Sequence, residues 1–301
     1  MNIDNESPFQ SLNRSKGVLI LDWDDTFLPT TFIMDNKLLL EGMKLVPPDG
    51  DTKIMIDTCC VKIIELFEMI LKLDLHAYIV TNALSMWVFM SAEHFYPDLF
   101  KSEVFWKIPV VSARDRYSVL HPISMSRWKN LAIRDIVVDH SINKINGNID
   151  NIQNIISIGD SNYERNAVLS LRTETIYVNS VLLELMGKPC PNIDITTLDL
   201  TNTLIKTIKL PDEPNQLDQF NAQLQYLIDN LASIVQEPID IDILITINNN
   251  IAPELEPEPE PEPEPESEYD FGQPMDIMKE LESIQTDTFI QFEFDDTSIQ
   301  G

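Results

Sequence analysis

Three aspartates follow directly on a short apolar run near the N-terminus. Residues 18–21 are Val-Leu-Ile-Leu, and Asp22, Asp24 and Asp25 come within the next four positions. An apolar run this short is typical of a strand that is buried on both faces of a parallel sheet. Carboxylates that follow such a strand lie at the edge where open α/β sheets bind ligands. Because buried, unpaired carboxylates are costly, we expect a cation or water beside them. The alternative interpretation is a strand that runs into an acidic loop.

Other polar side chains follow the later apolar runs of the chain. We expect strands over residues 76–81 and 154–158, and the carboxyl ends of parallel strands meet at one edge of a sheet. The residues expected at this edge are Thr81 and Asn82 after the second strand, Lys129 near the start of a helix, and Asp160 and Glu164 after the fourth strand. Such a group suits phosphoryl transfer, in which one carboxylate attacks phosphorus and others hold a hard cation. A hydroxyl, backbone amides and a lysine then hold the phosphate oxygens.

The hydrophobic pattern predicts the elements that must position these residues. Strands are expected over 17–22, 76–81, 109–113, 154–158 and 175–178, and helices from Asp57 or Thr58 to 71 and over 85–96, 127–139 and 162–171. Residues 27–56 are expected to be irregular, with a small hairpin-like flap. Strands that alternate with helices indicate βαβ units. The predicted fold class is therefore α/β: a three-layer, Rossmann-like parallel sheet with helices on both faces.

The domain is expected to span residues 16–236, after a flexible N-terminus of residues 1–15. Residues 193–210 are expected to hold one or two short strands. A helix over 214–235 ends the domain, because its apolar residues recur on one face.

Residues 237–301 are expected to form an acidic, disordered tail. Residues 254–266 repeat Pro-Glu, which favours an extended spacer because it has no apolar surface to bury. Residues 273–296 mix apolar and acidic side chains and are a candidate docking segment for a protein partner. The alternative is a disordered tail with isolated apolar residues.

The composition is strongly acidic. The net charge is −28, and residues 252–301 contribute −15 of it, from 16 Asp and Glu against Lys279. No basic stripe is evident, which argues against nucleic acid or an anionic membrane as a partner. Three cysteines fit a reducing compartment, and neither a secretory signal nor an apolar stretch of membrane-spanning length is evident. We expect an intracellular, soluble, cytoplasmic protein.

Four motifs in order resemble those of the haloacid dehalogenase (HAD) superfamily. The resemblance covers roughly residues 16–180. The matching positions are Asp22-Trp23-Asp24-Asp25-Thr26 for the first motif (Asp-x-Asp-x-Thr), Val80-Thr81-Asn82 for the second, Lys129 for the third, and Gly159-Asp160 with Glu164 for the fourth. The first and fourth motifs are specific in combination, and the second and third are weak individually. Lys101 and Lys107 lie in the same interval and are alternatives to Lys129.

The resemblance implies a role for each of these positions. Asp22 is the implied nucleophile that forms an aspartyl-phosphate, and Asp24 the implied general acid and base. An acid at position 24 is what the phosphatases of the superfamily carry. The implied Mg²⁺ ligands are Asp22, Asp24 (through its backbone carbonyl), Asp160 and Glu164, and the implied phosphate-binding residues are Thr81, Asn82 and Lys129.

The expected function is therefore a magnesium-dependent phosphatase that hydrolyses phosphate monoesters. The intervals 27–80 and 83–128 leave little room for a cap domain, so we expect a capless or minimally capped enzyme. An open site suits a phosphoprotein or a small phosphate ester as substrate. Two alternatives stay open: a phosphotransferase with the same chemistry, and a non-catalytic scaffold that uses the acidic tail to bind a partner.

Overall fold

The computed structural model of the chain describes residues 17–73, 75–122, 124–141, 152–178, 196–212 and 216–246. The chain divides into two units, one of residues 1–39 with 45–248 and one of residues 40–44 with 249–301. The expected flexible N-terminus and the expected tail beyond residue 246, including its docking segment, lie outside the described residues.

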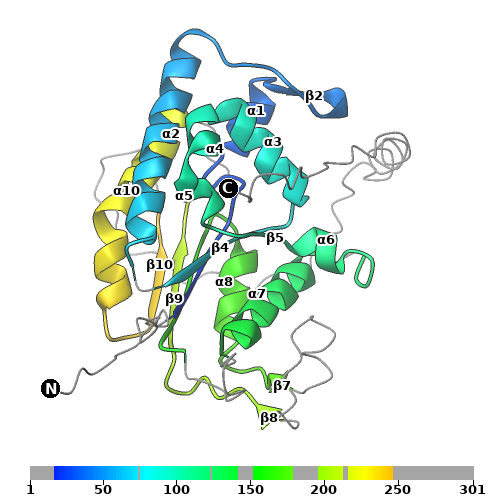
Figure 1. The fold of residues 1–301 in the computed structure, drawn as a ribbon, viewed down its shortest axis with the longest axis vertical. Coiled ribbons are helices and arrows are strands. Elements are labelled where there is room, and N and C mark those ends of the chain that lie inside the picture. Colours follow the sequence, from blue (N-terminus) through cyan, green and yellow to red (C-terminus); the bar gives the residue numbers. More distant parts are fainter. Residues whose placement is uncertain are drawn as a thin grey trace, which may run out of the picture. The chain divides into compact units, whose positions relative to one another are not determined.

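A six-stranded parallel sheet forms the centre of the first unit (Figure 1). Its strands, in spatial order, are β10 (Ile241–Leu244), β9 (Leu204–Lys209), β6 (Asn154–Gly159), β1 (Gly17–Leu21), β4 (His76–Thr81) and β5 (Val110–Ser112). After β1 the chain adds β4 and β5 on one side, and then returns to add β6, β9 and β10 on the other. The strand order therefore reverses at β1, and such a switch point is where open α/β sheets form a ligand crevice.

Helices cover both faces of this sheet. Leu19 and Leu21 pack in the core on one face, and Val18 and Ile20 pack in the core on the other, because successive side chains of a strand point to opposite faces. The first core contains residues of α2 (Gly50–Ile70), α3 (Ser85–Phe95), α4 (Pro97–Lys101), α5 (Glu103–Trp106) and α10 (Leu217–Gln236). The second contains residues of α6 (Ala113–Tyr117), α7 (Met125–Ser141) and α8 (Asn162–Ser170). The three-layer α/β prediction is confirmed.

Several short elements complete the described chain. Helix α1 spans Thr30–Asp35, and the 3₁₀ helix η1 spans Glu41–Met43. Strands β2 (Leu39–Leu40) and β3 (Lys44–Leu45) form a two-stranded sheet, and β7 (Tyr177–Val178) and β8 (Thr196–Thr197) form another.

The structure corrects the expected start of the first long helix. Helix α2 begins at Gly50, within the segment expected to be irregular, and Asp57 and Thr58 lie inside it. The Asp57 carboxylate accepts a hydrogen bond from Lys53 one turn earlier, and the Thr58 hydroxyl donates to the carbonyl of Ile54. Both polar groups are thus satisfied within the helix and do not mark its beginning.

The structure also corrects the predicted strands beyond β6 in the sheet. The strand expected over 175–178 forms only at Tyr177–Val178 and pairs antiparallel with β8, outside the parallel sheet. Strand β9 pairs with β6 in its place, and β10 extends the sheet beyond residue 236, the expected end of the domain. In β10, Ile241 and Ile243 pack on the core while Asp242 bonds to Arg165 and Thr207. This alternation is typical of a strand with one covered face.

Candidate active site

Two carboxylates occupy the edge of the sheet at its switch point. Asp22 is the first residue after β1, and its amide continues the ladder by donating to the carbonyl of Ile158. Asp160 is the first residue after β6, the strand that pairs with β1. The register of two adjacent parallel strands therefore brings together residues that are far apart in sequence.

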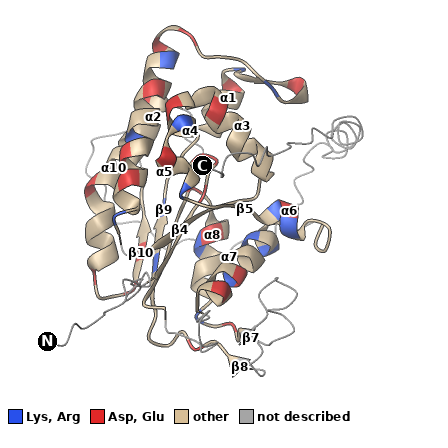
Figure 2. Ribbon diagram, in the orientation of Figure 1, with Lys and Arg blue, Asp and Glu red and all other residues tan. Residues whose placement is uncertain are grey.

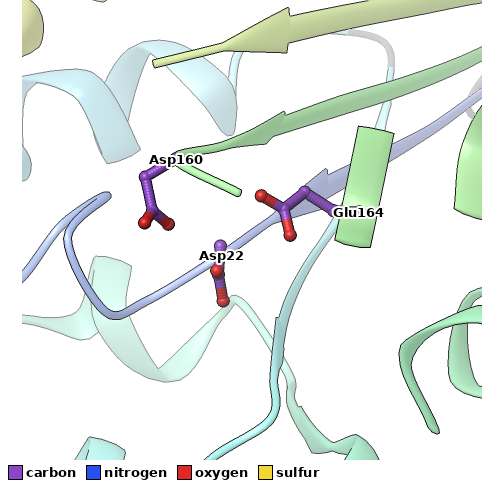
Figure 3. A group of neighbouring side chains, drawn as sticks. All are labelled: Asp22, Asp160 and Glu164. Carbon is purple, nitrogen blue, oxygen red and sulfur yellow. The ribbon is translucent and has the colours of Figure 1, made fainter. Parts of the chain in front are cut away.

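A third carboxylate completes a compact cluster. Asp22, Asp160 and Glu164 each offer one oxygen, and these oxygens all lie within 4.8 Å of one another. Figure 3 shows Asp22 and Asp160 reaching from the ends of two strands and Glu164 reaching from the first turn of α8. The predicted convergence of Asp22 with the fourth-strand acids is present in the structure.

Lys129 lies between two of these acids. From α7, its Nζ is 2.7 Å from Oδ2 of Asp22 and 2.9 Å from Oε2 of Glu164, and its side chain is only 2% exposed. Lys101 and Lys107 are exposed on the helical segment after α3. Of these three lysines, the structure places only Lys129 at the site.

Glu164 is held in place by the start of its own helix. Ser161 caps α8, and its amide and hydroxyl both donate to the Glu164 carboxylate at 2.8 Å. A Cβ at Gly159 would lie 2.0 Å from Oε1 of Glu164, so only glycine leaves room for this carboxylate. Ser161 and Lys129 together donate three hydrogen bonds to Glu164, one to Oε1 and two to Oε2. Its geometry suits positioning Lys129 better than direct ligation of a metal.

Burial shifts the pKa values of the clustered groups. Burial, which the charge of Lys129 only partly offsets, raises the pKa of Asp22 to about 7. Burial and the neighbouring charges of Asp22 and Glu164 raise the pKa of Asp160 to about 8. For Lys129, burial acts to lower the pKa, but the charges of Asp22 and Glu164 outweigh it and raise the pKa above its usual value. Because one lysine does not balance three buried carboxylates, Asp22 and Asp160 tend to keep a proton near neutral pH when no cation is beside them.

The donor set fits a hard divalent cation. Three carboxylates and one ammonium leave a formal charge of −3 + 1 = −2 when all are ionised. Carboxylate oxygens are the ligands that Mg²⁺ prefers in proteins. Asp22 and Asp160 are the acids best suited to hold such an ion, which would offset their mutual repulsion.

Asp24 is not one of the three clustered acids, although its charge helps to raise the pKa of Asp22. Its Oδ1 accepts hydrogen bonds from Thr30 Oγ1 at 2.6 Å and from Trp87 Nε1 at 2.7 Å. Its Oδ2 lies 3.5 Å from the hydroxyl of Thr81. The carboxylate is partly exposed, so it is both oriented and accessible. The side chain of Asp24 therefore does not join the carboxylate cluster. Its direction is fixed by the hydrogen bonds from Thr30 and Trp87.

The rest of the first motif shapes the loop. Asp25 has a positive φ of 50°, a conformation that aspartate tolerates better than most residues. Its carboxylate accepts from the amide and hydroxyl of Thr31, and its carbonyl accepts from Gln223 of α10. The buried Thr26 hydroxyl lies 3.5 Å from Oδ1 of Asp160. These contacts tie the loop after β1 to α1, to α10 and to Asp160, so Asp25 and Thr26 have structural roles.

Thr81 and Asn82 lie where the sequence predicts, at the end of β4. Thr81 is fully buried, and its hydroxyl accepts from the amide of Ala83 at 2.9 Å. The Oδ1 atom of Asn82 is buried without a hydrogen-bond partner among the described residues. Thr81 thus contacts Asp24. The buried Oδ1 of Asn82 accepts no hydrogen bond from the part of the chain that the structure describes.

From the sequence, Trp87 is a residue that could line the site, with core packing the preferred interpretation, but neither Trp87 nor Thr30 is identified as a donor to Asp24. Thr30 opens α1 within a segment expected to be irregular, and Trp87 lies in an apolar helix in which packing is the simplest interpretation. The only signal in the sequence is proximity, since Trp87 follows Asn82 by little more than one helical turn. The direction of the Trp87 side chain depends on how α3 packs against the sheet, and the sequence pattern does not specify that packing.

Comparison with known proteins adds no relative: the chain matches no family model, no curated protein and no solved structure. Within the described residues, no helix has the length and apolarity needed to cross a bilayer.

Proposed function

We propose that this chain is a magnesium-dependent phosphatase of the HAD type, with Asp22 as its nucleophile. The observation that carries the proposal is the convergence of Asp22, Asp160 and Lys129 at the switch point of a parallel sheet. A phosphate monoester needs a nucleophile, a cation and charge compensation at one place, and this edge supplies groups suited to all three.

The fixed direction of the Asp22 carboxylate supports nucleophilic attack. Its Oδ1 accepts from the amide of Trp23 at 2.9 Å, and its Oδ2 contacts Lys129. An Asp22 oxygen attacks phosphorus, the bond from phosphorus to the ester oxygen breaks, and Asp24 gives that oxygen its proton. Asp24 then takes a proton from water, whose oxygen attacks phosphorus and releases orthophosphate, which restores Asp22.

The remaining residues bind and compensate charge. Lys129 offsets the charge of Asp22 and of the phosphoryl oxygens, and Glu164 holds Lys129 in place. Asp22 and Asp160 would hold Mg²⁺, which supplies charge neutralisation for the phosphoryl group when bound. Thr81 would donate to a phosphate oxygen through its hydroxyl and Asn82 through its amide, both at the end of β4.

Hydrolysis of an aryl phosphate with and without Mg²⁺ tests the proposal. Wild-type protein is expected to release phenol and orthophosphate in equal amounts with Mg²⁺, and Asp22→Asn is expected to lose this turnover while keeping its fold. Asp57→Asn makes the same chemical change at a half-exposed helix position and serves as the matched control.

Two results would count against the proposal. Wild-type protein without Mg²⁺-dependent turnover would favour the scaffold, and phenol release without orthophosphate would favour a phosphotransferase. The second result would then be followed by a search for the phosphorylated acceptor.

A further inference from the structure

Helix α3 carries Trp87 in its first turn, but its own sequence supplies no cap for that turn. The residue before the helix is Leu84, which has no capping side chain, and no acidic residue lies in the first turn. The first amides of a helix have no partner within it, and they favour a negative charge nearby. In Figure 2 the helix is almost wholly uncharged, whereas α6 carries charged residues. The start of α3 is therefore open to a partner from another element.

Asp115 of α6 is that partner. Its Oδ2 accepts a hydrogen bond from the amide of Ser85 at 3.1 Å and another from the Ser85 hydroxyl at 2.6 Å. Its negative charge lies at the end of α3 where the helix dipole favours one. Ser85 is the first residue of α3 and Trp87 the third, so both belong to one helical turn. Asp115 thus holds the turn from which the Trp87 indole projects.

Ser112, at the end of β5, fixes both Asp115 and the loop before α3. Its hydroxyl accepts from the amide of Asp115 at 2.9 Å and donates to the carbonyl of Ala83 at 2.7 Å. The amide of Ala83 in turn donates to the hydroxyl of Thr81. Ser112 is buried, which shields its hydrogen bonds from competing water. The loop after β4 is therefore fixed to the end of the neighbouring strand.

The turn that Asp115 holds leads directly to the proposed general acid. The Trp87 indole donates to Oδ1 of Asp24 at 2.7 Å, and only 7% of the Trp87 side chain is exposed. Because Asp115 bonds to Ser85, its effect on Asp24 passes through the first turn of α3 and the indole. A displaced helix start would move the indole and change the direction of the Asp24 carboxylate.

We infer that Asp115 is a positioning residue for the general acid: it fixes the first turn of α3 and so directs the Trp87 indole at Asp24. The inference rests on the proposed phosphatase function and bears on one step of it, the protonation of the leaving oxygen. Proton transfer depends on the direction of the acid. Asp115 should therefore matter most for substrates whose leaving oxygen needs a proton.

The kcat/KM of Asp115→Ala for two substrates tests this inference, because kcat/KM reports on the step in which the leaving group departs. With an alkyl phosphate we expect kcat/KM to fall by about fivefold, since the leaving oxygen needs a proton. With p-nitrophenyl phosphate, whose leaving group is a stable anion, we expect a loss of less than about twofold. Asp115→Asn keeps an oxygen that can accept from Ser85 and is expected to recover most of the alkyl phosphate activity.

A double variant shows whether Asp115 acts through the indole. In a Trp87→Phe background, adding Asp115→Ala is expected to lower kcat/KM for the alkyl phosphate by less than about twofold more. Residues that act independently would instead give losses that multiply.

Asp199→Ala provides the matched control. The Asp199 carboxylate also accepts from the amide and the hydroxyl of one residue, Thr201, at 2.9 and 2.6 Å in an exposed segment before β9. This variant is expected to leave kcat/KM unchanged for both substrates. Circular dichroism and urea unfolding check that every variant folds.

The indole N–H signal of Trp87 in a proton–nitrogen NMR spectrum gives a readout that needs no turnover. The chain has four tryptophans, and Trp87→Phe identifies the signal by its loss. In Asp115→Ala we expect this hydrogen to exchange with solvent about fivefold faster than in wild type, because the turn that carries it opens more often. In Asp199→Ala its exchange is expected to match wild type.

These readouts separate the inference from the proposed function. Faster indole exchange in a protein without Mg²⁺-dependent turnover would remove the phosphatase and keep Asp115 as the residue that directs Trp87. Normal wild-type turnover with unchanged indole exchange in Asp115→Ala would do the reverse. Equal losses for the two substrates, multiplied losses in the double variant, or an equal loss with Asp199→Ala would also overturn the inference.

Discussion

The indole Nε1 of Trp87 donates a 2.7 Å hydrogen bond to Oδ1 of Asp24 and so joins helix α3 to the loop after β1. Thr30 donates to the same oxygen from α1. The direction of the Asp24 carboxylate is therefore set by two helices that flank it. For a general acid, direction matters because proton transfer requires hydrogen-bond geometry with the leaving oxygen.

Trp87→Phe should impair proton donation while keeping most of the packing. We expect kcat to fall by about 10-fold, with KM within about twofold, because Asp24 loses a donor that orients it. The loss should be larger for an alkyl phosphate, whose leaving oxygen needs a proton, than for p-nitrophenyl phosphate. Trp106→Phe is the matched control, because its indole donates to the carbonyl of Phe100 at an exposed position. Equal losses for both substrates would contradict a role through Asp24.

Lys129→Met should destabilise the fold as well as abolish turnover. It leaves Asp22 and Glu164 buried without their shared cation, and removing one partner of a buried ion pair costs about 3–5 kcal/mol. The change is measured as the free energy of unfolding in urea. Unchanged stability would mean that the two acids are neutral or hydrated in the folded protein.

Lys206→Met should separate stability from activity. The buried Nζ of Lys206 donates to the carbonyls of Ile234, Val235 and Glu237, at the end of α10. Without these donors the last carbonyls of the helix lose their partners, at a cost of about 1–3 kcal/mol. Magnesium-dependent turnover per folded molecule should match wild type when both are assayed well below their melting temperatures. A folded but inactive Lys206→Met protein would contradict the assignment of Lys206 to stability alone.

Mg²⁺ should stabilise the protein more at high pH than at low pH. The pKa values of Asp22 and Asp160 are raised to about 7 and about 8 from 3.8. Between the unfolded and folded pKa values the folded state holds protons that the unfolded state releases, so the stability of the metal-free protein falls as pH rises through this range. Mg²⁺ competes with those protons. The rise in Tm on adding Mg²⁺ should therefore be larger at pH 8.5 than at pH 6. A larger rise at pH 6 would contradict competition between Mg²⁺ and protons at Asp22 and Asp160.

The sequence predicted best those elements whose side chains are buried on both faces. The strand over 76–81 is confirmed to the residue, and the strands around Val18 and Ile156 are confirmed within one residue at each end. A short apolar run that is rich in β-branched residues and bounded by loop residues favours a buried strand over a buried helix. The positions of Asp22 and Asp160 follow from those strands, which is why their convergence could be predicted.

The sequence predicted less well the elements that depend on tertiary contacts. Strand β10 is short, follows Pro238 and carries Asp242 between its two core-packed isoleucines, so no long apolar run marks it. The start of α2 was misplaced because Asp57 and Thr58 resemble a helix cap. The Trp87 contact required the packing direction of α3, which periodicity alone does not provide.

The position of β1 in the middle of the sheet has a consequence for synthesis. Its partner on one side, β4, follows soon in the chain, but its partner on the other side, β6, is made only after residue 153. A nascent chain therefore carries one bare strand edge and an incomplete set of acids until β6 leaves the ribosome. An unpaired strand edge can pair with another chain. A truncated protein that ends before β6 is therefore expected to aggregate more readily than the full chain.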